Sequence, residues 1–341
     1  MRTIIGEMHA MSYAAERRAA VEAVLKACRL CQKVQANLVT EDTLAKKDKS
    51  PVTVADYGAQ AVVCHDLMTV FPDDPMVGEE DAKALRDPAN AALKDQVVRH
   101  VREITPGLDE AEVLKAIDRG VHEGGAGGRH WTLDPIDGTK GFLRGDQYAV
   151  ALALIENGEV VLGVLGCPNL PHDGRDFDGS KGCVFIAEKD SGAFMRRLDS
   201  ETEERISVTG ITDPSEANFC ESVESAHSSQ DDSAKVAEKL GITAPPYRID
   251  SQCKYAAVSR GDASIYLRLP TKKGYEEKIW DHAAGVMVIR EAGGRVTDCR
   301  GDELDFSIGR TLRDNLGVVV TNGKLHDPVV RAVREVLELN D

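Results

Sequence analysis

The segment 131–139, Trp-Thr-Leu-Asp-Pro-Ile-Asp-Gly-Thr, constrains this chain most, because it groups two carboxylates, a glycine and a hydroxyl at one change of chain direction. Residues 131–133 are typical of the end of a buried strand. Pro135 has no N–H to donate to a sheet, so we expect the chain to turn there. The turn would bring Asp134 and Asp137 toward one point. Carboxylates and a backbone carbonyl at a turn suit Mg²⁺, which prefers oxygen ligands, better than zinc.

Further polar groups extend this chemistry. Gly138 lets the backbone approach a phosphate closely, and Thr139 offers a hydroxyl beside a metal. A Gly-Glu-Glu motif lies far upstream at 78–80. Asp56 precedes a helical pattern and is expected near its start, where the helix dipole favours a carboxylate, and Asp281 stands at the start of a later helix. Any one of these carboxylates alone is also typical of a helix cap or a turn, so only the set indicates a site.

Composition limits the function classes. The 341 residues exceed the usual single-core size, so we expect one large domain or two closely packed domains. No apolar run approaches the roughly 18 residues that a membrane span needs, which predicts a soluble protein. The net charge of -15 argues against broad binding to nucleic acids or anionic membranes. An anionic substrate would therefore need metal ions to offset the surrounding carboxylates.

The cysteines indicate a reducing compartment. All eight are scattered and no signal peptide precedes them, so we expect a cytoplasmic protein. Cys28 and Cys31 lie in a helical pattern without a second ligand pair, which favours packing over zinc binding or redox chemistry. Residues 1–10 precede a second Met, and we interpret them as a short extension ahead of the fold.

The first half of the chain predicts helices over an antiparallel sheet. Apolar residues recur at three- and four-residue spacing over 12–38, which predicts a long amphipathic helix. The charged, Ala-rich region 82–130 is interpreted as a helical insertion that ends in a flexible, glycine-rich joint at 124–128. Two apolar runs within 148–165 are bridged by Asn-Gly, a strong hairpin signal, and a second such pair spans 183–198.

The second half alternates strand and helix, which predicts a mixed sheet covered by helices. Strands are expected at 219–223, 247–249, 263–269 and 316–321, and helices before Gly241, at 254–260, at 281–292 and from Pro328 onward. We therefore divide the chain into an N-terminal α+β metal-binding domain, 12–205, and a C-terminal α/β nucleotide-binding domain, 206–341.

Three motifs carry a family resemblance. Gly-Glu-Glu at 78–80, Asp-Pro-Ile-Asp-Gly-Thr at 134–139 and Trp-Asp-His-Ala-Ala-Gly at 280–285 resemble, in order and distance, the lithium-sensitive, magnesium-dependent phosphomonoesterase superfamily. This superfamily includes inositol monophosphatases and fructose-1,6-bisphosphatases. The resemblance implies their layered αβαβα sandwich, a fold of the α+β or α/β class. It covers nearly the whole chain.

Within that superfamily the chain is most similar to the 3'(2'),5'-bisphosphate nucleotidases. The stretches that carry this likeness lie outside the metal core, at 51–56, 138–148, 221–229, 250–254 and 266–270. The long insertion before residue 131 also fits this branch.

The resemblance assigns roles residue by residue. It implies that up to three Mg²⁺ ions are held by Glu79, Asp134, the carbonyl of Ile136, Asp137 and Asp281. Asp56 and Thr139 would orient and deprotonate the attacking water, and Thr139 can relay a proton only if Asp56 accepts it. The substrate contacts would come from Gly138, Thr139, His227, Ser251, Lys254, Arg268 and Asp281. Lys254 and Arg268 would supply positive charge that this acidic chain otherwise lacks.

Three functions remain open from the sequence. The first is hydrolysis of the 3'-phosphate of adenosine 3',5'-bisphosphate to AMP, and of its sulfated form, 3'-phosphoadenylyl sulfate, in sulfur metabolism. The second keeps the chemistry but takes an inositol polyphosphate such as inositol 1,4-bisphosphate. The set Ser251, Lys254 and Arg268 favours a nucleotide with a remote 5'-phosphate. The third is a non-catalytic nucleotide sensor, against which the complete carboxylate set argues. We expect a monomer whose partner is a small nucleotide.

Overall fold

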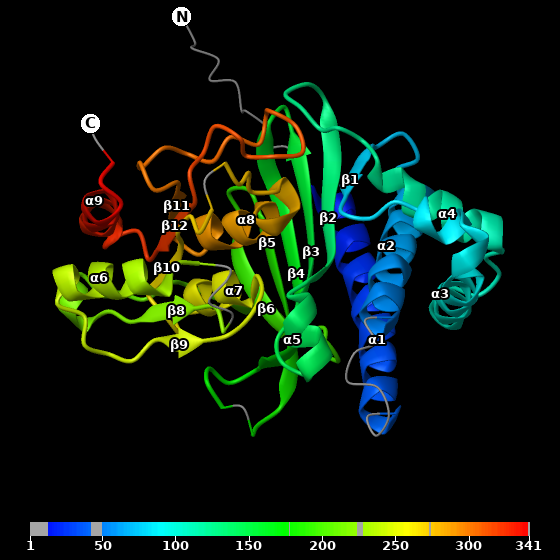
Figure 1. Cartoon of the computed structure of the whole chain (residues 1–341), viewed down its shortest axis with the longest axis horizontal. Helices are drawn as coiled ribbons and strands as arrows, with labels where there is room; N and C mark the ends of the chain where they lie inside the picture. Colours follow the sequence, from blue (N-terminus) through cyan, green and yellow to red (C-terminus); the bar gives the residue numbers. More distant parts are fainter. Residues whose placement is uncertain (1–12, 42–49, 177, 224–227, 273, 340–341) are drawn as a thin grey trace, which may run out of the picture.

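The computed structural model describes residues 13–41, 50–176, 178–223, 228–272 and 274–339. Its elements form five layers that alternate between helices and sheets (Figure 1). A helical layer covers a seven-stranded sheet, a central layer of two helices separates that sheet from a five-stranded one, and two further helices cover the far side. This arrangement confirms the layered αβαβα sandwich expected from the sequence.

The first helical layer is the pair α1 (Ala14–Glu41) and α2 (Ser50–Val70). Apolar positions of α1, including Cys28 and Cys31, are buried against the sheet, so the packing role predicted for the two thiols is confirmed. The 82–130 region packs outside this pair and is helical, as expected (Figure 1). Its elements are η1 (Ala84–Arg86), η2 (Pro88–Asn90), α3 (Ala91–Ile104), α4 (Glu110–Ile117) and η3 (Asp118–Gly120).

The large sheet is antiparallel except for its first pair, and its strands follow chain order. They are β1 (Met76–Gly78), β2 (Arg129–Asp137), β3 (Ala149–Glu156), β4 (Glu159–Pro171), β5 (Lys181–Glu188), β6 (Gly192–Arg197) and β7 (Glu204–Arg205). Both predicted hairpins are confirmed. Asn157 and Gly158 join β3 to β4 with φ of 52° and 81°, the left-handed conformation that a two-residue hairpin turn requires.

Both faces of this sheet are buried, and strand β3 illustrates the division. Val150, Leu152 and Leu154 pack toward α1 and α2, whereas the intervening alanines face the central layer. Small residues on that second face allow a helix to approach closely. A Cβ at Gly163 of β4 would lie 2.7 Å from the carbonyl oxygen of Ala284 in α8.

The second sheet has the order β11-β12-β10-β8-β9. Its strands are β8 (Phe219–Glu221), β9 (Tyr247–Arg248), β10 (Ile265–Arg268), β11 (Arg295–Thr297) and β12 (Val318–Thr321). The central layer contains α7 (Cys253–Ser259) and α8 (Ala283–Glu291), the latter preceded by η5 (Ile279–Asp281). The outer layer contains α6 (Gln230–Leu240) and α9 (His326–Val336), and η4 (Pro214–Glu216) leads into β8.

Three short strands have no counterpart in the sequence analysis. Strands β1, β7 and β11 are two or three residues long, too short to show a period of two, and only pairing with a longer neighbour defines them. The strands of the first sheet lie within 76–205 and those of the second within 219–321. Because α8 packs against β4 as well as against the second sheet, the division at residue 205 stays a prediction.

In the part of the chain that the structure describes, no helix combines the length and the apolar character needed to cross a membrane.

Candidate active site

The parallel pairing of β1 and β2 brings the first two carboxylates together. Gly78 pairs with Leu133, so the residues that follow, Glu79 and Asp134, leave the two strands side by side. The amide of Glu79 also donates to the carbonyl of Leu133 at 3.3 Å. The carboxyl ends of parallel strands share one edge, which is why residues 55 positions apart meet here.

A bulge in β2 turns a third carboxylate to the same face. Three steps along β2, from Asp134 to Asp137, match only two steps on β3, from Ala151 to Ala149. Without the extra residue the two aspartates would point to opposite faces, because side chains alternate along a strand. The expectation that Pro135 ends the strand is wrong, since β2 continues through it to Asp137. The bulge interrupts the ladder where proline has no N–H to donate.

Two further carboxylates approach from helices. Asp281 closes η5, just before α8, as the sequence predicts. Asp56 is buried within α2, whose first residue is Ser50, so its expected place near the helix start is wrong. The helix begins earlier than the apolar spacing suggested because Pro51 is tolerated in a first turn. Burial and neighbouring carboxylates therefore dominate the surroundings of Asp56, rather than the helix dipole.

The grouped carboxylates raise one another's pKa values. Burial, the charges of Asp281 and Glu80, and that of Asp137 raise the pKa of Glu79 to about 7, although a hydrogen bond with Asp134 opposes the shift. Burial and Asp281 likewise raise the pKa of Asp137 to about 6. The carboxylates thus lie close enough to repel one another in a buried setting.

Asp134 and Asp56 are affected in the same direction. Burial raises the pKa of Asp134 well above its usual range, and the charges of Glu79 and Asp137 add to this effect. Burial, followed by the charges of Glu80 and Glu79, raises the pKa of Asp56. All five predicted carboxylates are therefore connected in one electrostatic cluster.

A tight loop from the second half closes over this cluster. Ser251 adopts the left-handed conformation, with φ of 65°, and the next amide, of Gln252, donates to the carboxylate of Asp137. Gly138 also has positive φ, 89°, and a Cβ there would lie 2.8 Å from the Cβ of Ser251. Only glycine allows the two segments to approach so closely.

Two predicted cations, Lys254 and Arg268, line a narrow pocket together with Asp137 and Asp281. The Nζ of Lys254 donates to the carbonyl of Ser251 at 2.7 Å and lies 5.2 Å from the ring centre of Tyr266. Arg268 contacts Asp281 at 3.1 Å and Glu277 at 2.8 Å. Both cations also lower the pKa of Asp137, which only partly offsets the effect of burial and Asp281.

The remaining predicted residues have different outcomes. Thr139 is the first residue of α5 (Thr139–Arg144) and its side chain is exposed. Among the described residues no hydrogen bond joins it to Asp56, so the relay stays a prediction. The side chain of Ile136 packs in the core, which leaves its carbonyl as the group available for a ligand role. His227 lies outside the described residues.

Comparisons with known proteins identify the family of this chain. The model of the inositol monophosphatase family matches residues 6–338. The chain belongs to the inositol monophosphatase family. Solved structures of this family agree with the fold: the Mycobacterium tuberculosis SuhB structure superposes with a TM-score of 0.62 at 20% identity, covering 97% of this chain and all of that one. An inositol monophosphatase from Anabaena gives a TM-score of 0.60 at 20% identity, covering 94% of this chain and 96% of that one.

Family members of higher sequence identity carry a more specific name. A rice protein named 3'(2'),5'-bisphosphate nucleotidase is 48% identical, covering 96% of this chain and 95% of its own length. A protein of the same name from Emericella nidulans is 46% identical, covering 96% of this chain and all of its own length. The resemblance inferred from the motifs is confirmed.

The inositol monophosphatase family is metal-dependent, and the carboxylate cluster fits a metal ion. The Oδ1 atom of Asp134 is buried and has no hydrogen-bond partner among the described residues. An unpartnered carboxylate oxygen is costly inside a protein unless a cation binds it. Its neighbours Glu79, Asp137 and Asp281 offer the hard oxygen ligands that Mg²⁺ takes.

A second acidic group lies beside this family site. Ligand atoms of Glu277, Asp281 and His282 all lie within 4.8 Å of one another. Glu277 already accepts from Arg268 at 2.8 Å and contacts His282 at 3.1 Å. Although burial acts to raise it, the pKa of Glu277 is lowered by His282 and Arg268. We therefore interpret Glu277 as the residue that orients Arg268, not as a metal ligand.

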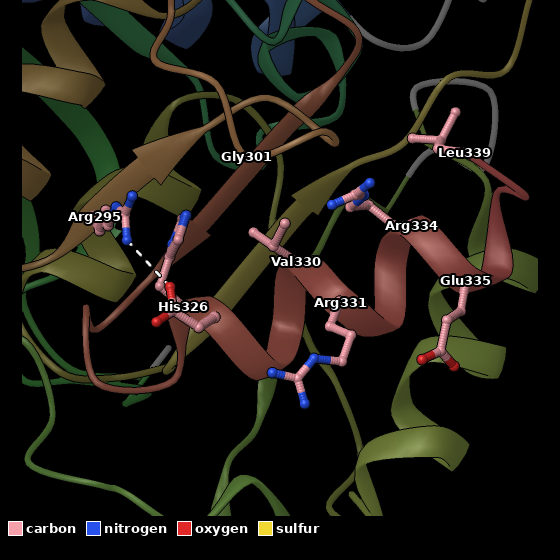
Figure 2. A pocket seen from close by; sticks show the side chains of 9 residues that line it. Arg295, Gly301, His326, Val330, Arg331, Arg334, Glu335 and Leu339 are labelled. Carbon is pink, nitrogen blue, oxygen red and sulfur yellow. Dashed lines mark hydrogen bonds and ion pairs between the residues drawn. The ribbon is translucent and has the colours of Figure 1, made fainter. Parts of the chain in front are cut away.

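A further hollow, of about 600 Å³, lies along α9 between Arg295, Arg331 and Leu339 (Figure 2). Two ion pairs involve residues that line it: Arg295 contacts Asp327 at 3.2 Å, and Glu335 contacts Lys239 at 2.9 Å.

Sequence reasoning missed several residues that shape the family site. Gln60 of α2 exchanges hydrogen bonds with the backbone of Glu80, at 2.5 and 3.1 Å, and so positions the Gly-Glu-Glu loop. A Cβ at Gly78 would lie 2.6 Å from the side-chain oxygen of Gln60, which explains the glycine of that motif. Glu277 and Arg310 were also missed. The sequence signal that could have identified Gln60 is its polar side chain on an otherwise apolar helix.

Proposed function

We propose that this chain is a Mg²⁺-dependent phosphomonoesterase that removes the 3'-phosphate of adenosine 3',5'-bisphosphate to give AMP. The observation that carries the proposal is that Asp137 and Asp281, members of the carboxylate cluster around Asp134, line one narrow pocket together with the cations Lys254 and Arg268. The relatives named 3'(2'),5'-bisphosphate nucleotidase support the choice of substrate. We extend the proposal to the sulfated nucleotide, and with it to a place in sulfur metabolism.

The carboxylates would hold up to three Mg²⁺ ions, as the family resemblance implies. Glu79, Asp134, Asp137, Asp281 and the carbonyl of Ile136 form the proposed ligand set. When bound, the ions supply charge neutralisation for the phosphoryl group and acidify a coordinated water. Lithium sensitivity belongs to the same proposal.

This chain's own residues would orient the reaction. Asp56, buried beside Glu79 and Glu80, has its pKa raised by that burial and those charges, which suits a carboxyl that exchanges a proton with the attacking water. Thr139, at the first residue of α5, would hold that water on the side of Gly138. Because Gly138 has no side chain, its backbone is proposed to approach the phosphate closely beside the bulge.

The second half would bind the nucleotide. Lys254 and Arg268 are proposed to contact the 5'-phosphate, with Ser251 and His227 around the ribose and base. Arg268 is held by Glu277 and Asp281, so its planar guanidinium is pre-oriented before substrate arrives. A monomeric state and a cytoplasmic location remain our predictions.

The decisive experiment compares phosphate release from four substrates at saturating Mg²⁺: adenosine 3',5'-bisphosphate, inositol 1,4-bisphosphate, inositol 1-phosphate and fructose 1,6-bisphosphate. We expect kcat/KM to be highest for the nucleotide. Lys254→Ala should then raise KM for the nucleotide by about tenfold or more, because it removes a charge-assisted contact, while kcat changes less.

Other outcomes would change the assignment. A preference for an inositol phosphate would keep the metal site but reassign Ser251, Lys254 and Arg268. Absence of turnover on all four substrates, with nucleotide binding retained, would support the sensor. Adenosine 3'-phosphate, which lacks the 5'-phosphate, is the matched control for the Lys254→Ala variant, because both should lose the same contact.

A further inference from the structure

Arg310 connects the two halves of the chain across the metal-binding edge. Its Nη2 donates to the carbonyl of Gly78 at 2.6 Å, and its Nη1 donates to the carbonyls of Gly120 and His122 at 3.1 and 2.9 Å. Arg310 lies between β11 and β12, whereas its three acceptors lie around β1. A single guanidinium therefore fixes three backbone groups of the first half.

The planar face of the same guanidinium contacts the second half of the chain. It lies over the ring of Trp280, 4.9 Å from the ring centre. The backbone carbonyl of Arg310 also accepts from the amide of Ile279 at 3.1 Å. Gly78 immediately precedes Glu79, and Trp280 immediately precedes Asp281, so Arg310 contacts the neighbour of a ligand on each side.

No carboxylate forms an ion pair with Arg310 in the described part of the chain. The guanidinium instead uses its donors on carbonyl oxygens and its face on an aromatic ring, a combination that Lys cannot reproduce. The contacts of Arg310 therefore hold backbone groups in position and do not neutralise a carboxylate.

Arg310 can contact the carbonyls around β1 because the backbone before it lies close to the glycine-rich segment 124–128. A Cβ at Gly124 would lie 3.3 Å from the carbonyl of Gly309, and one at Gly309 would lie 3.1 Å from the carbonyl of Glu123. Both glycines have positive φ, 72° and 131°. The first residue of the segment predicted as a flexible joint, Gly124, thus packs against the residue before Arg310.

We propose that Arg310 is a positioning residue that sets the separation of Glu79 and Asp281 and so tunes the affinity of the site for divalent metal. The inference deepens the proposed function and rests on its metal site. Arg310 would act through the residues adjacent to Glu79 and Asp281, not as a metal ligand.

The test measures metal binding without substrate. Binding of Mn²⁺ is followed by the electron paramagnetic resonance signal of the free ion, for the wild type, Arg310→Gln and Arg310→Lys. We expect Arg310→Gln to weaken Mn²⁺ binding about tenfold, the loss typical of outer-shell partners, and Arg310→Lys to give an intermediate loss. The fluorescence of Trp280 should shift in the same variants, because its ring loses the guanidinium.

Arg119→Gln is the matched control. Arg119 also donates to two carbonyls near β1, those of Pro72 and Asp74 at 2.9 and 2.8 Å, but neither precedes a ligand. Its Mn²⁺ affinity should stay within twofold of the wild type. Where Arg310→Gln fails to fold, Arg310→Lys decides the question. Wild-type affinity in a folded Arg310 variant, or an equal loss in Arg119→Gln, would overturn the proposal.

The same samples separate this inference from the proposed function. Weakened Mn²⁺ binding in Arg310→Gln, in a protein that releases phosphate from none of the four substrates, would retain the positioning role and reject the enzyme. Turnover of the nucleotide, together with an unchanged Mn²⁺ affinity in Arg310→Gln, would support the enzyme and reject the positioning role of Arg310.

Discussion

At the scale of single residues, the carboxylate of Asp134 has neighbours that repel it and an oxygen without a hydrogen-bond partner among the described residues. That oxygen is buried, and the repelling neighbours are Glu79 and Asp137. Stable proteins rarely keep such a group without a function for it. The cost is explained if the group is a metal ligand, since the ion supplies both the partner and the counter-charge.

Asp134→Asn tests this reading directly. Removing one ligand charge should lower kcat/KM at least about 100-fold, since even outer-shell partners of metal ligands cost roughly 10–100-fold. Phosphate release at several Mg²⁺ concentrations measures the effect. Asp327→Asn, on α9 and remote from the carboxylates, serves as the control. A folded Asp134→Asn protein with more than a tenth of the wild-type activity would exclude Asp134 from the ligand set.

The raised carboxylate pKa values predict how stability varies with pH. Glu79, with its pKa raised to about 7, and Asp137, raised to about 6, bind more protons in the folded, metal-free protein than in the unfolded chain. Their contribution is therefore present below about pH 4 and is lost as the pH rises toward 7.

Thermal unfolding in EDTA and in Mg²⁺, between pH 5 and pH 8, measures this effect. In EDTA the melting temperature should fall across that range, and the stabilisation by Mg²⁺ should grow, because metal and protons compete for the same carboxylates. Glu79→Gln should flatten the EDTA profile. A melting temperature in EDTA that rises steadily from pH 5 to pH 7 would contradict the assignment.

At the scale of elements, packing overrides local propensity around α5. Gly141 lies inside this short helix, where alanine would ordinarily be favoured by about 1 kcal/mol. A Cβ at this position would lie 2.2 Å from the carbonyl of Gln147 and 3.2 Å from the side chain of Asp250. The helix therefore docks against the 250–252 loop only with glycine at its centre.

Gly141→Ala should consequently destabilise the protein despite its helix propensity. We expect a loss of about 1–3 kcal/mol in the free energy of unfolding, the usual cost of overpacking, measured by urea denaturation. Gly127→Ala is the control, because a Cβ there meets nothing within 4 Å. Wild-type stability of Gly141→Ala would show that the contact relaxes at no cost.

The strand β2 shows what an element's sequence leaves open. Its apolar start and its two aspartates are readable, and their shared site was predicted. The bulge between Asp134 and Asp137 was not, because a proline indicates the end of a strand as readily as an irregularity within one. Pairing with β3 settles the question, since only the partner strand defines the extra residue.

At the scale of the whole molecule, each half of the chain completes the other. Alanines of β3 and residues of β4 and β5 are buried by α7 and α8, which come from the second half. The ligands are divided in the same way, with Asp281 from the second half and the other carboxylates from the first. The site is therefore a property of the assembled chain.

A fragment of residues 13–205 tests this dependence. Without α7 and α8 it would expose one whole face of the seven-stranded sheet, so we expect it to bind a hydrophobic dye and to lack a cooperative thermal transition. Circular dichroism melts of the fragment and the full chain make the comparison. A sharp transition in the fragment would mean that the first half folds independently, in agreement with the predicted domain division.

The sequence by itself determined the family, because its motifs are local, and the layered fold class followed from that family resemblance. The same motifs predicted the carboxylates of the site. The tertiary structure alone decided how the motifs meet. The β1 and β2 register, the bulge before Asp137, the reach of Arg310 and the partners of Arg268 all join residues far apart in the chain. Such contacts leave no periodic trace, since each depends on which surfaces pack together after the elements have formed.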